Sequence, residues 1–188
     1  MTLLPSILRG LPLFSGMDAP TKDALLAQGR LRSCPRGQML FAQGDAADRF
    51  FLVASGVVQL FRTTPEGHAK TIDLLHAGQM MGEGEIMDNC RHYRTNAVPA
   101  EDAAVLEFPA RWLKDTAQAH PSFALNLLGA MSARAHMAEI EAEHQASMSA
   151  AQLVACFLQR LCVLTDGDPK RFSLPYSKTL IASRLGME

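Results

Sequence analysis

The sequence predicts an α+β protein in which an antiparallel β roll lies between short N-terminal helices and a longer helical C-terminal part. Between Arg30 and Phe108, short apolar or alternating runs are separated by turn signals that contain glycine, a pattern typical of a sandwich or rolled barrel. An eight-stranded roll, of the jelly-roll kind, fits the number of runs. After Phe108 the spacing becomes helical, and residues 120–148 contain nothing that stops a helix for about seven turns.

Length and composition suit one large domain or one domain with a smaller one. The chain has 188 residues, of which 48% are hydrophobic, so it can bury a sizeable core. No segment approaches the ~20 uninterrupted apolar residues of a membrane span, and the first residues, broken by Pro5 and Pro12, lack the order of a signal peptide. A net charge of -1 gives no overall attraction to nucleic acid. We therefore expect a cytoplasmic protein with no membrane partner.

Motifs for metal binding and catalysis are missing from the sequence. The four cysteines, Cys34, Cys90, Cys156 and Cys162, are scattered, whereas zinc and iron–sulfur sites need clustered thiolates. There is no H-x-H pair of the kind a cupin-type metalloenzyme needs, and no G-x-S-x-G or H-E-x-x-H motif. We expect free thiols, no metal site, no catalytic residues and no enzymatic activity.

The individual elements follow from local signals. Short helices are expected in residues 1 to about 28, with Gly29 ending the last of them. The runs expected as strands are LRSC, QMLF, RFFLVA, VVQLFRT, KTIDLL, QMM, a strand through Val98, and AVLEF. Pro65-Glu66-Gly67 predicts a hairpin, because glycine supplies the positive φ that such a turn needs. Beyond the roll, helices are expected at 109–119, 120–148, 149–165 and 177–187, the last capped by Ser177 and ended by Gly186, with a short strand at 171–175.

The helix expected at 120–148 carries small and apolar side chains at spacings of three and four. Small residues along so long a stripe let a second helix approach closely, so we interpret the helix as the seam of a homodimer. The expected seam residues are Ala124, Leu127, Leu128, Met131, Ala135, Ala138 and Ala142. The alternative is a helix that lies on the core of its own domain. The chain is predicted to divide into three parts. Residues 1–119 form the roll with its N-terminal helices, residues 120–148 form the dimerisation helix, and residues 149–188 form a separate C-terminal domain.

One stretch inside the roll breaks the strand pattern and predicts an anion site. Gly82 and Gly84 flank Glu83 and free the backbone to turn into a short helix, whose first amides would bind phosphate. Eleven residues after Glu83 come Arg94 and Thr95, and an arginine and a hydroxyl facing those amides would complete the pocket. Glu83 would then accept a hydrogen bond from a sugar hydroxyl.

The order of these motifs resembles the cyclic-AMP receptor protein and fumarate–nitrate regulator superfamily of bacterial transcription regulators. It runs from RGQMLFAQGDAADRFFLVASGVVQL through TPEGHAKTIDLLHAGQMMGEGE and Arg-Thr to the long helix, nearly the whole chain. The resemblance implies a cyclic-nucleotide-binding jelly roll, a dimer along the long helix and a C-terminal winged helix-turn-helix. It implies that the effector contacts Gly82, Glu83, Gly84, Glu85, Arg94, Thr95, Ala138 and Glu139.

Two positions depart from the cyclic-AMP receptors. Those receptors place a threonine and a serine on the long helix to reach the adenine, whereas this chain has Ala138 and Glu139. Residues 83–97, with a tyrosine ten residues after Glu83, also resemble the denitrification regulators, which bind haem and respond to nitric oxide. The cofactors to consider are therefore a cyclic nucleotide and haem, with His76 and His92 as the axial-ligand candidates. The N-terminal cysteine cluster of iron–sulfur oxygen sensors is missing.

The functional prediction is a dimeric, ligand-responsive transcription regulator that couples a small-molecule or gas effector to DNA binding. On the resemblance, LPYSKTLIASRLGME falls on the first helix of the helix-turn-helix and the turn after it, so the recognition helix is absent from this chain. DNA contacts are then expected only from Ser177, Lys178 and Thr179, which would position the protein without reading sequence. The expectation is a chain that dimerises and binds its effector but has no sequence-specific DNA affinity. The alternative is a sensor and dimerisation module that acts through a partner.

Overall fold

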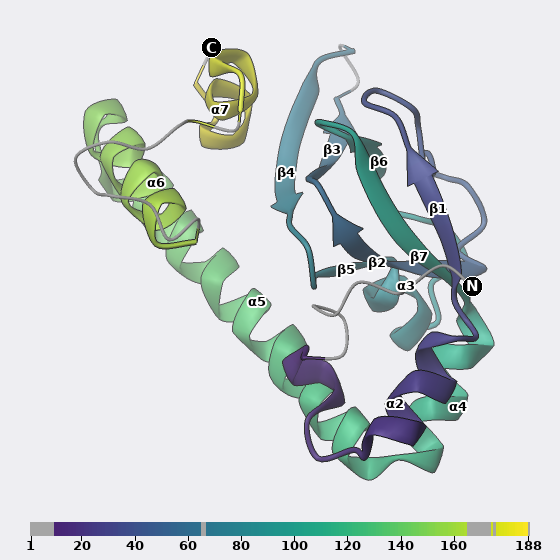
Figure 1. Ribbon diagram of the computed structural model, residues 1–188. Helices are drawn as coiled ribbons and strands as arrows, with labels where there is room; N and C mark the ends of the chain where they lie inside the picture. Colours follow the sequence, from purple (N-terminus) through teal and green to yellow (C-terminus); the bar gives the residue numbers. More distant parts are fainter. Residues whose placement is uncertain (1–9, 65–66, 165–173, 175, 188) are drawn as a thin grey trace. The chain divides into compact units, whose positions relative to one another are not determined.

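The computed structural model describes residues 10–64, 67–164, 174 and 176–187 (Figure 1). The chain forms two compact units, Met1–Ser132 and Ala133–Glu188, and the boundary falls inside the long helix. The boundaries predicted at residues 119 and 148 therefore stay predictions. Among the described residues, no helix is long and apolar enough to cross a membrane.

Within the residues described from Gly10 onward, the first unit starts with two short helices, as the sequence predicts. They are η1 (Pro12–Phe14), a single 3₁₀ turn, and α2 (Ala19–Leu26). Asp18 caps α2, since its side chain accepts a hydrogen bond from the Thr21 amide at 3.1 Å.

Seven strands follow in the described part of this unit. They are β1 (Arg30–Cys34), β2 (Arg49–Ser55), β3 (Val58–Thr63), β4 (Ala69–Leu75), β5 (Met80–Met81), β6 (Asn96–Pro99) and β7 (Ala103–Pro109). They form a four-stranded sheet in the order β1-β7-β2-β5 and a three-stranded sheet in the order β4-β3-β6, and every pair is antiparallel. The predicted α+β class with an antiparallel roll is confirmed.

The prediction of eight strands is wrong for the described residues, because the run QMLF is not a strand. Only Phe41 forms a bridge, to Ala97. The run lies between turns at Gly37 and Gly44, both with positive φ. The predicted hairpin lies between β3 and β4, which pair from Thr63 with Ala69 back to Val58 with Leu75. Gly67 has a φ of 87°, and Pro65 and Glu66 lie outside the described residues.

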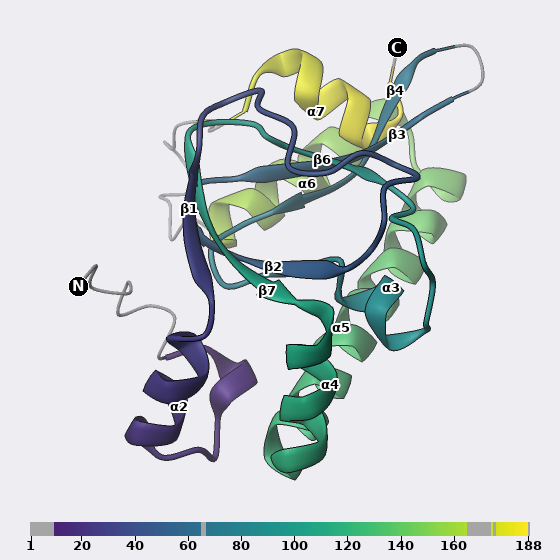
Figure 2. The same cartoon turned by 90° about the vertical axis from the view of Figure 1, so that its right-hand side faces the viewer.

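Two buried clusters form the core of this unit, one on each face of the four-stranded sheet. Successive residues of a strand point to opposite faces, so Phe50 joins the cluster beneath the helices while Phe51 points into the roll. In both views α2 and α4 (Ala110–Ala119) lie on the side of β2 and β7 away from the three-stranded sheet (Figure 1, Figure 2). The double burial explains why RFFLVA reads as a continuous apolar run rather than an alternating one.

The long helix is confirmed as α5 (Pro121–Ser147). Its first turns belong to the first unit: Phe123 and Leu127 are fully buried in the cluster beneath the helices. The Asn126 side-chain amide donates to the Leu13 carbonyl at 3.2 Å and to the Ser15 carbonyl at 2.9 Å, which ties α5 to the segment around η1. After Met131, no residue of α5 is fully buried in this chain.

The second unit contains the rest of α5, with α6 (Ala150–Leu164) and α7 (Lys178–Leu185). As predicted, Ser177 caps α7 by accepting from the Leu180 amide at 3.2 Å, and Gly186 ends the helix with a φ of 69°. The strand expected at 171–175 lies outside the described residues except for Leu174, which is in no strand.

Candidate functional site

The predicted anion site is built on α3 (Glu83–Met87), a short helix that follows β5. Gly82 turns the chain into this helix with a φ of 84°. A Cβ at this position would lie 3.1 Å from the Arg49 carbonyl oxygen and 3.1 Å from Cε1 of Tyr93. Gly82 is therefore required both by its left-handed backbone and by the close packing around it.

Gly84 does not have the role that the sequence suggested. It lies inside α3, its φ is not positive, and a Cβ built on it meets nothing within 4 Å. Only one of the two glycines is needed for the turn. Glu83, at the first helical position, is buried with 5% of its surface exposed.

Arg94 is paired at the C-terminal end of α3, whereas the prediction placed it opposite the first amides of this helix. Its guanidinium is half exposed and pairs with Asp88, with a distance of 2.5 Å from Nη2 to Oδ2. Its backbone amide donates to Oε1 of Glu85 at 3.2 Å, and its carbonyl accepts from Nε of Arg62 at 3.2 Å. These contacts hold Arg94 at the C-terminal end of the short helix, where Asp88 is the capping residue.

The ion pair between Arg94 and Asp88 determines the electrostatics at the C-terminal end of α3. The Cys90 amide and the Arg94 guanidinium lower the pKa of Asp88, and the hydrogen bond and charge of Asp88 raise the pKa of Arg94. Both groups are charged at neutral pH, so an anion that binds Arg94 must compete with a carboxylate already in place. Asp88 was not among the predicted site residues, although an acid six residues before an arginine across a tight turn was a readable signal.

Aromatic rings pack in the interior of the roll next to the Arg94–Asp88 ion pair. Tyr93 is 4% exposed, stacks on Phe41 with ring centroids 3.9 Å apart, and donates from its hydroxyl to the Arg49 carbonyl at 2.6 Å. Phe41 in turn stacks on Phe51 at 5.6 Å. Burial is the main cause that raises the pKa of Tyr93. Thr95 follows at the edge and is half-buried.

The other predicted effector residues lie elsewhere in the described chain. Ala138 and Glu139 are exposed on the part of α5 that belongs to the second unit, and Glu139 lies 3.6 Å from Nδ1 of His136. His92 is exposed and bridges to Ala46, while the His76 amide donates to Oε1 of Gln79 at 2.7 Å. The described residues contain no cluster of metal-ligating side chains.

The expected dimer seam divides between two sides of α5. Leu127 is buried in the core of its own unit, so its assignment to the seam is wrong, and Met131 is half-buried against the same core. Leu125 and Leu128 instead expose 69% and 63% of their surface. The exposed residues at alternating spacings of three and four are Leu125, Leu128, Ser132, Ala135, Glu139, Ala142 and Ala146.

In the second unit, the α7 residues proposed to contact DNA are only partly free. The hydroxyl of Ser177 is used as the helix cap, whereas Lys178 and Thr179 are exposed. At the other end of α7, Arg184 pairs with Glu141 of α5, which also accepts from Arg160 of α6. One carboxylate therefore connects the three helices that the structure describes in this unit.

Comparison with known proteins shows what this chain is similar to. The family model described as a cyclic nucleotide-binding domain matches residues 31–120. The cyclic AMP receptor protein of Thermus thermophilus is 32% identical over 154 residues, which cover 82% of this chain and 71% of that protein. The solved structure of the catabolite activator protein from the same organism is 30% identical with a TM-score of 0.63, covering 94% of this chain and 80% of that chain. FixK2 from Bradyrhizobium japonicum, 18% identical, shares the fold with a TM-score of 0.74 over 85% of this chain and 78% of its own.

Proposed function

The chain belongs to the cyclic-AMP receptor protein and fumarate–nitrate regulator superfamily and is a ligand-responsive transcription regulator; we propose that it binds a small phosphate-bearing effector, such as a cyclic nucleotide, beside α3. The observation that carries the proposal is the half-exposed Arg94, held at the end of a helix whose entry only glycine allows. A relative at 32% identity carries cyclic AMP in its name, and the matched domain is named for cyclic nucleotides.

The proposed binding step is an exchange of anions at Arg94. A phosphate would replace the carboxylate of Asp88 on the guanidinium, and a charge-assisted contact of this kind is about twice as strong as a neutral hydrogen bond. Thr95 would add a hydroxyl beside it, and Glu83 would accept from a sugar hydroxyl. Gly84 and Glu85 belong to the same short helix as Glu83, whereas Ala138 and Glu139 belong to the second unit. Ala138 offers no hydrogen bond, and Glu139 would repel a phosphate.

Calorimetric titration of cyclic AMP and cyclic GMP into wild type and Arg94→Ala tests this proposal. We expect binding by wild type and none measurable by the variant. Arg91→Ala is the matched control, because Arg91 is a neighbouring exposed arginine with no ion pair among the described contacts. If Arg94→Ala binds as well as wild type, or wild type binds neither nucleotide, the proposal is wrong.

The haem-dependent gas sensor is the second reading, and the geometry gives it less support. The part of the roll near α3 is filled by the stacked rings of Phe41, Tyr93 and Phe51. A Soret band in the visible spectrum of the purified protein would reverse this order of preference.

We also propose that the regulator is a cytoplasmic homodimer joined along α5. The exposed leucines at 125 and 128 give the seam an apolar start, and the small residues Ala135 and Ala142 continue it at coiled-coil spacing. DNA would be met through α7, the first helix of the helix-turn-helix, with Lys178 and Thr179 toward the phosphates. A gel-shift titration at low salt with promoter and scrambled DNA tests this: equal binding to both is expected from phosphate contacts, and binding to neither favours a sensor module that acts through a partner.

A further inference from the structure

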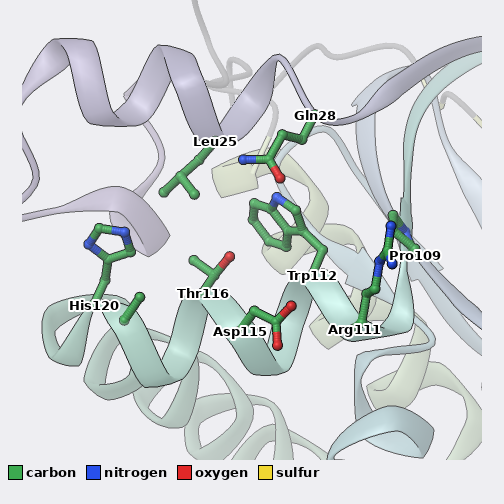
Figure 3. Close-up of a pocket in the computed structure, with 9 residues that line it drawn as sticks. Leu25, Gln28, Pro109, Arg111, Trp112, Asp115, Thr116 and His120 are labelled. Carbon is green, nitrogen blue, oxygen red and sulfur yellow. The ribbon is translucent and has the colours of Figure 1, made fainter.

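A cleft of about 320 Å³ lies between α2 and α4 in the first unit, on the outer side of the four-stranded sheet (Figure 3). Leu25 and Gln28 border it from the α2 side, and Trp112, Thr116 and His120 border it from α4. None of the residues proposed for the effector site lines this cleft. It is therefore a separate place where a small molecule could bind.

The indole of Trp112 is the most informative group in the cleft. The residue is 4% exposed, and its Nε1–H has no hydrogen-bond acceptor among the described residues. A buried donor without an acceptor costs about 1–3 kcal/mol, so such groups are rare without a reason. In Figure 3 the indole nitrogen lies at the end of the ring nearest Gln28, at the border of the cleft.

The packing around the indole prevents the ring from turning to find an acceptor inside the protein. Its centroid lies 4.4 Å from that of Phe108, 5.5 Å from that of Phe50 and 5.7 Å from that of Phe123. Three aromatic neighbours fix the plane and the direction of the ring. The position of the N–H is thus set by the core. The nitrogen is itself covered from solvent and lies beside the Gln28 side chain in Figure 3, so an acceptor from the cleft reaches it when the exposed Gln28 side chain moves aside.

The charges in the cleft indicate which acceptor fits. Arg111, next to Trp112, is exposed and has no ion pair in the described part of the chain. Both Trp112 and Arg111 are donors only, so they select for an acceptor that carries negative charge. Asp115, one turn further along α4, offsets part of the charge of Arg111, and the titratable His120 lies at the far end. This balance suits a single negative charge better than a phosphate dianion.

We propose that the cleft binds a small organic monocarboxylate, with one carboxylate oxygen accepting from Trp112 Nε1–H and the charge paired with Arg111. The apolar part of the ligand lies on Leu25, and the Thr116 hydroxyl, turned toward the cleft in Figure 3, is a further polar contact. The volume is at the small end of the range for ligand pockets, about 300–1,000 Å³. His120 lines the cleft and directly precedes α5, so a ligand bound in the cleft would lie next to the start of the long helix.

The test uses the only tryptophan of the chain as the probe. Hexanoate, a monocarboxylate with an unbranched apolar tail, is titrated into the full chain while the fluorescence and the single indole ¹H–¹⁵N cross-peak are recorded. We expect a saturable change in both, with a downfield shift of the indole proton as it gains an acceptor. Hexylammonium, with the same tail and the opposite charge, serves as the matched probe and should give neither change.

Two variants locate the site. Arg111→Gln should weaken hexanoate binding about tenfold or more, because the charged partner is lost. Lys114→Gln removes a cation from the same helix but outside the cleft, where Lys114 donates to Asn89 at 2.7 Å, and should bind as wild type does. The proposal is overturned by the absence of saturation, by an equal response to hexylammonium, by an indole cross-peak that hexanoate leaves unchanged, or by equal losses in the two variants.

Discussion

The carboxylate of Glu141 offers the sharpest test of how the second unit is held together. It accepts hydrogen bonds from Arg160 of α6 and Arg184 of α7, and 28% of its side chain is exposed, against 12% for Arg184. Burial alone would raise the pKa of Glu141, but the hydrogen bonds and charges of the two arginines outweigh burial and lower it. Glu141→Gln keeps the shape and one acceptor oxygen but removes the charge.

The expected loss is about 2 kcal/mol, because hydrogen bonds to charged groups contribute about 1.5–3 kcal/mol and the partial exposure of this cluster reduces that value. Measured by hydrogen exchange at neutral pH, the protection of the α7 amides should fall about thirtyfold. Glu143→Gln is the control, because this substitution removes the same charge from the same helix. Glu143 is exposed and has no side-chain ion pair among the described contacts. Equal protection of α7 in the two variants would refute the reasoning.

The comparison of wild type with Glu141→Gln should also depend on pH. A carboxyl group whose folded pKa is lowered contributes stability above its unfolded pKa, near 4.3 for glutamate, and loses that contribution as the pH falls through the folded value. The difference in α7 protection between wild type and Glu141→Gln should therefore be full at neutral pH. It should shrink once the solution is more acidic than about pH 4.

Three further outcomes are expected. Gly82→Ala should lower the free energy of unfolding by about 2 kcal/mol in urea titrations, through left-handed strain and the 3.1 Å contacts, whereas Gly84→Ala should be neutral or stabilising; equal effects would contradict the geometry. Leu128→Glu should give monomers by light scattering without changing protomer melting, while Leu127→Glu should unfold the first unit; a dimeric Leu128→Glu would place the interface elsewhere. Asp88→Asn should tighten the binding of a phosphate-bearing effector severalfold at low salt, and unchanged affinity would show that Asp88 is no competitor.

The fold was largely predictable because its signals are local. The Ser177 cap, the Gly186 stop and the uninterrupted spacing of residues 121–147 act within a few turns of one helix, so the sequence alone determines them. The run QMLF was predicted as a strand from its apolar residues, but between the turns at Gly37 and Gly44 it forms a single bridge, from Phe41 to Ala97.

The candidate site was predictable only where backbone geometry decides. Gly82 was correctly identified as a turn glycine, because positive φ is a property of one residue. The direction of Arg94 was not, because it depends on Asp88 at the opposite end of α3. Leu127 and Leu128 could not be told apart, since α5 has apolar residues both toward its own core and toward solvent, and periodicity does not say which side is covered.

The anchoring of α5 by Asn126 determines where this helix is free to bend. Phe123, Leu127 and the two hydrogen bonds of Asn126 fix its first turns, and burial in the chain ends after Met131. Gly129, a weak helix former with open space around it, lies at this change. The helix from Gly129 to Ser147 is about 27 Å long. A bend of about 10° at Gly129 would therefore displace Ser147 by about 5 Å. A small displacement at the base of α5 is thereby amplified into one comparable to a full helical turn.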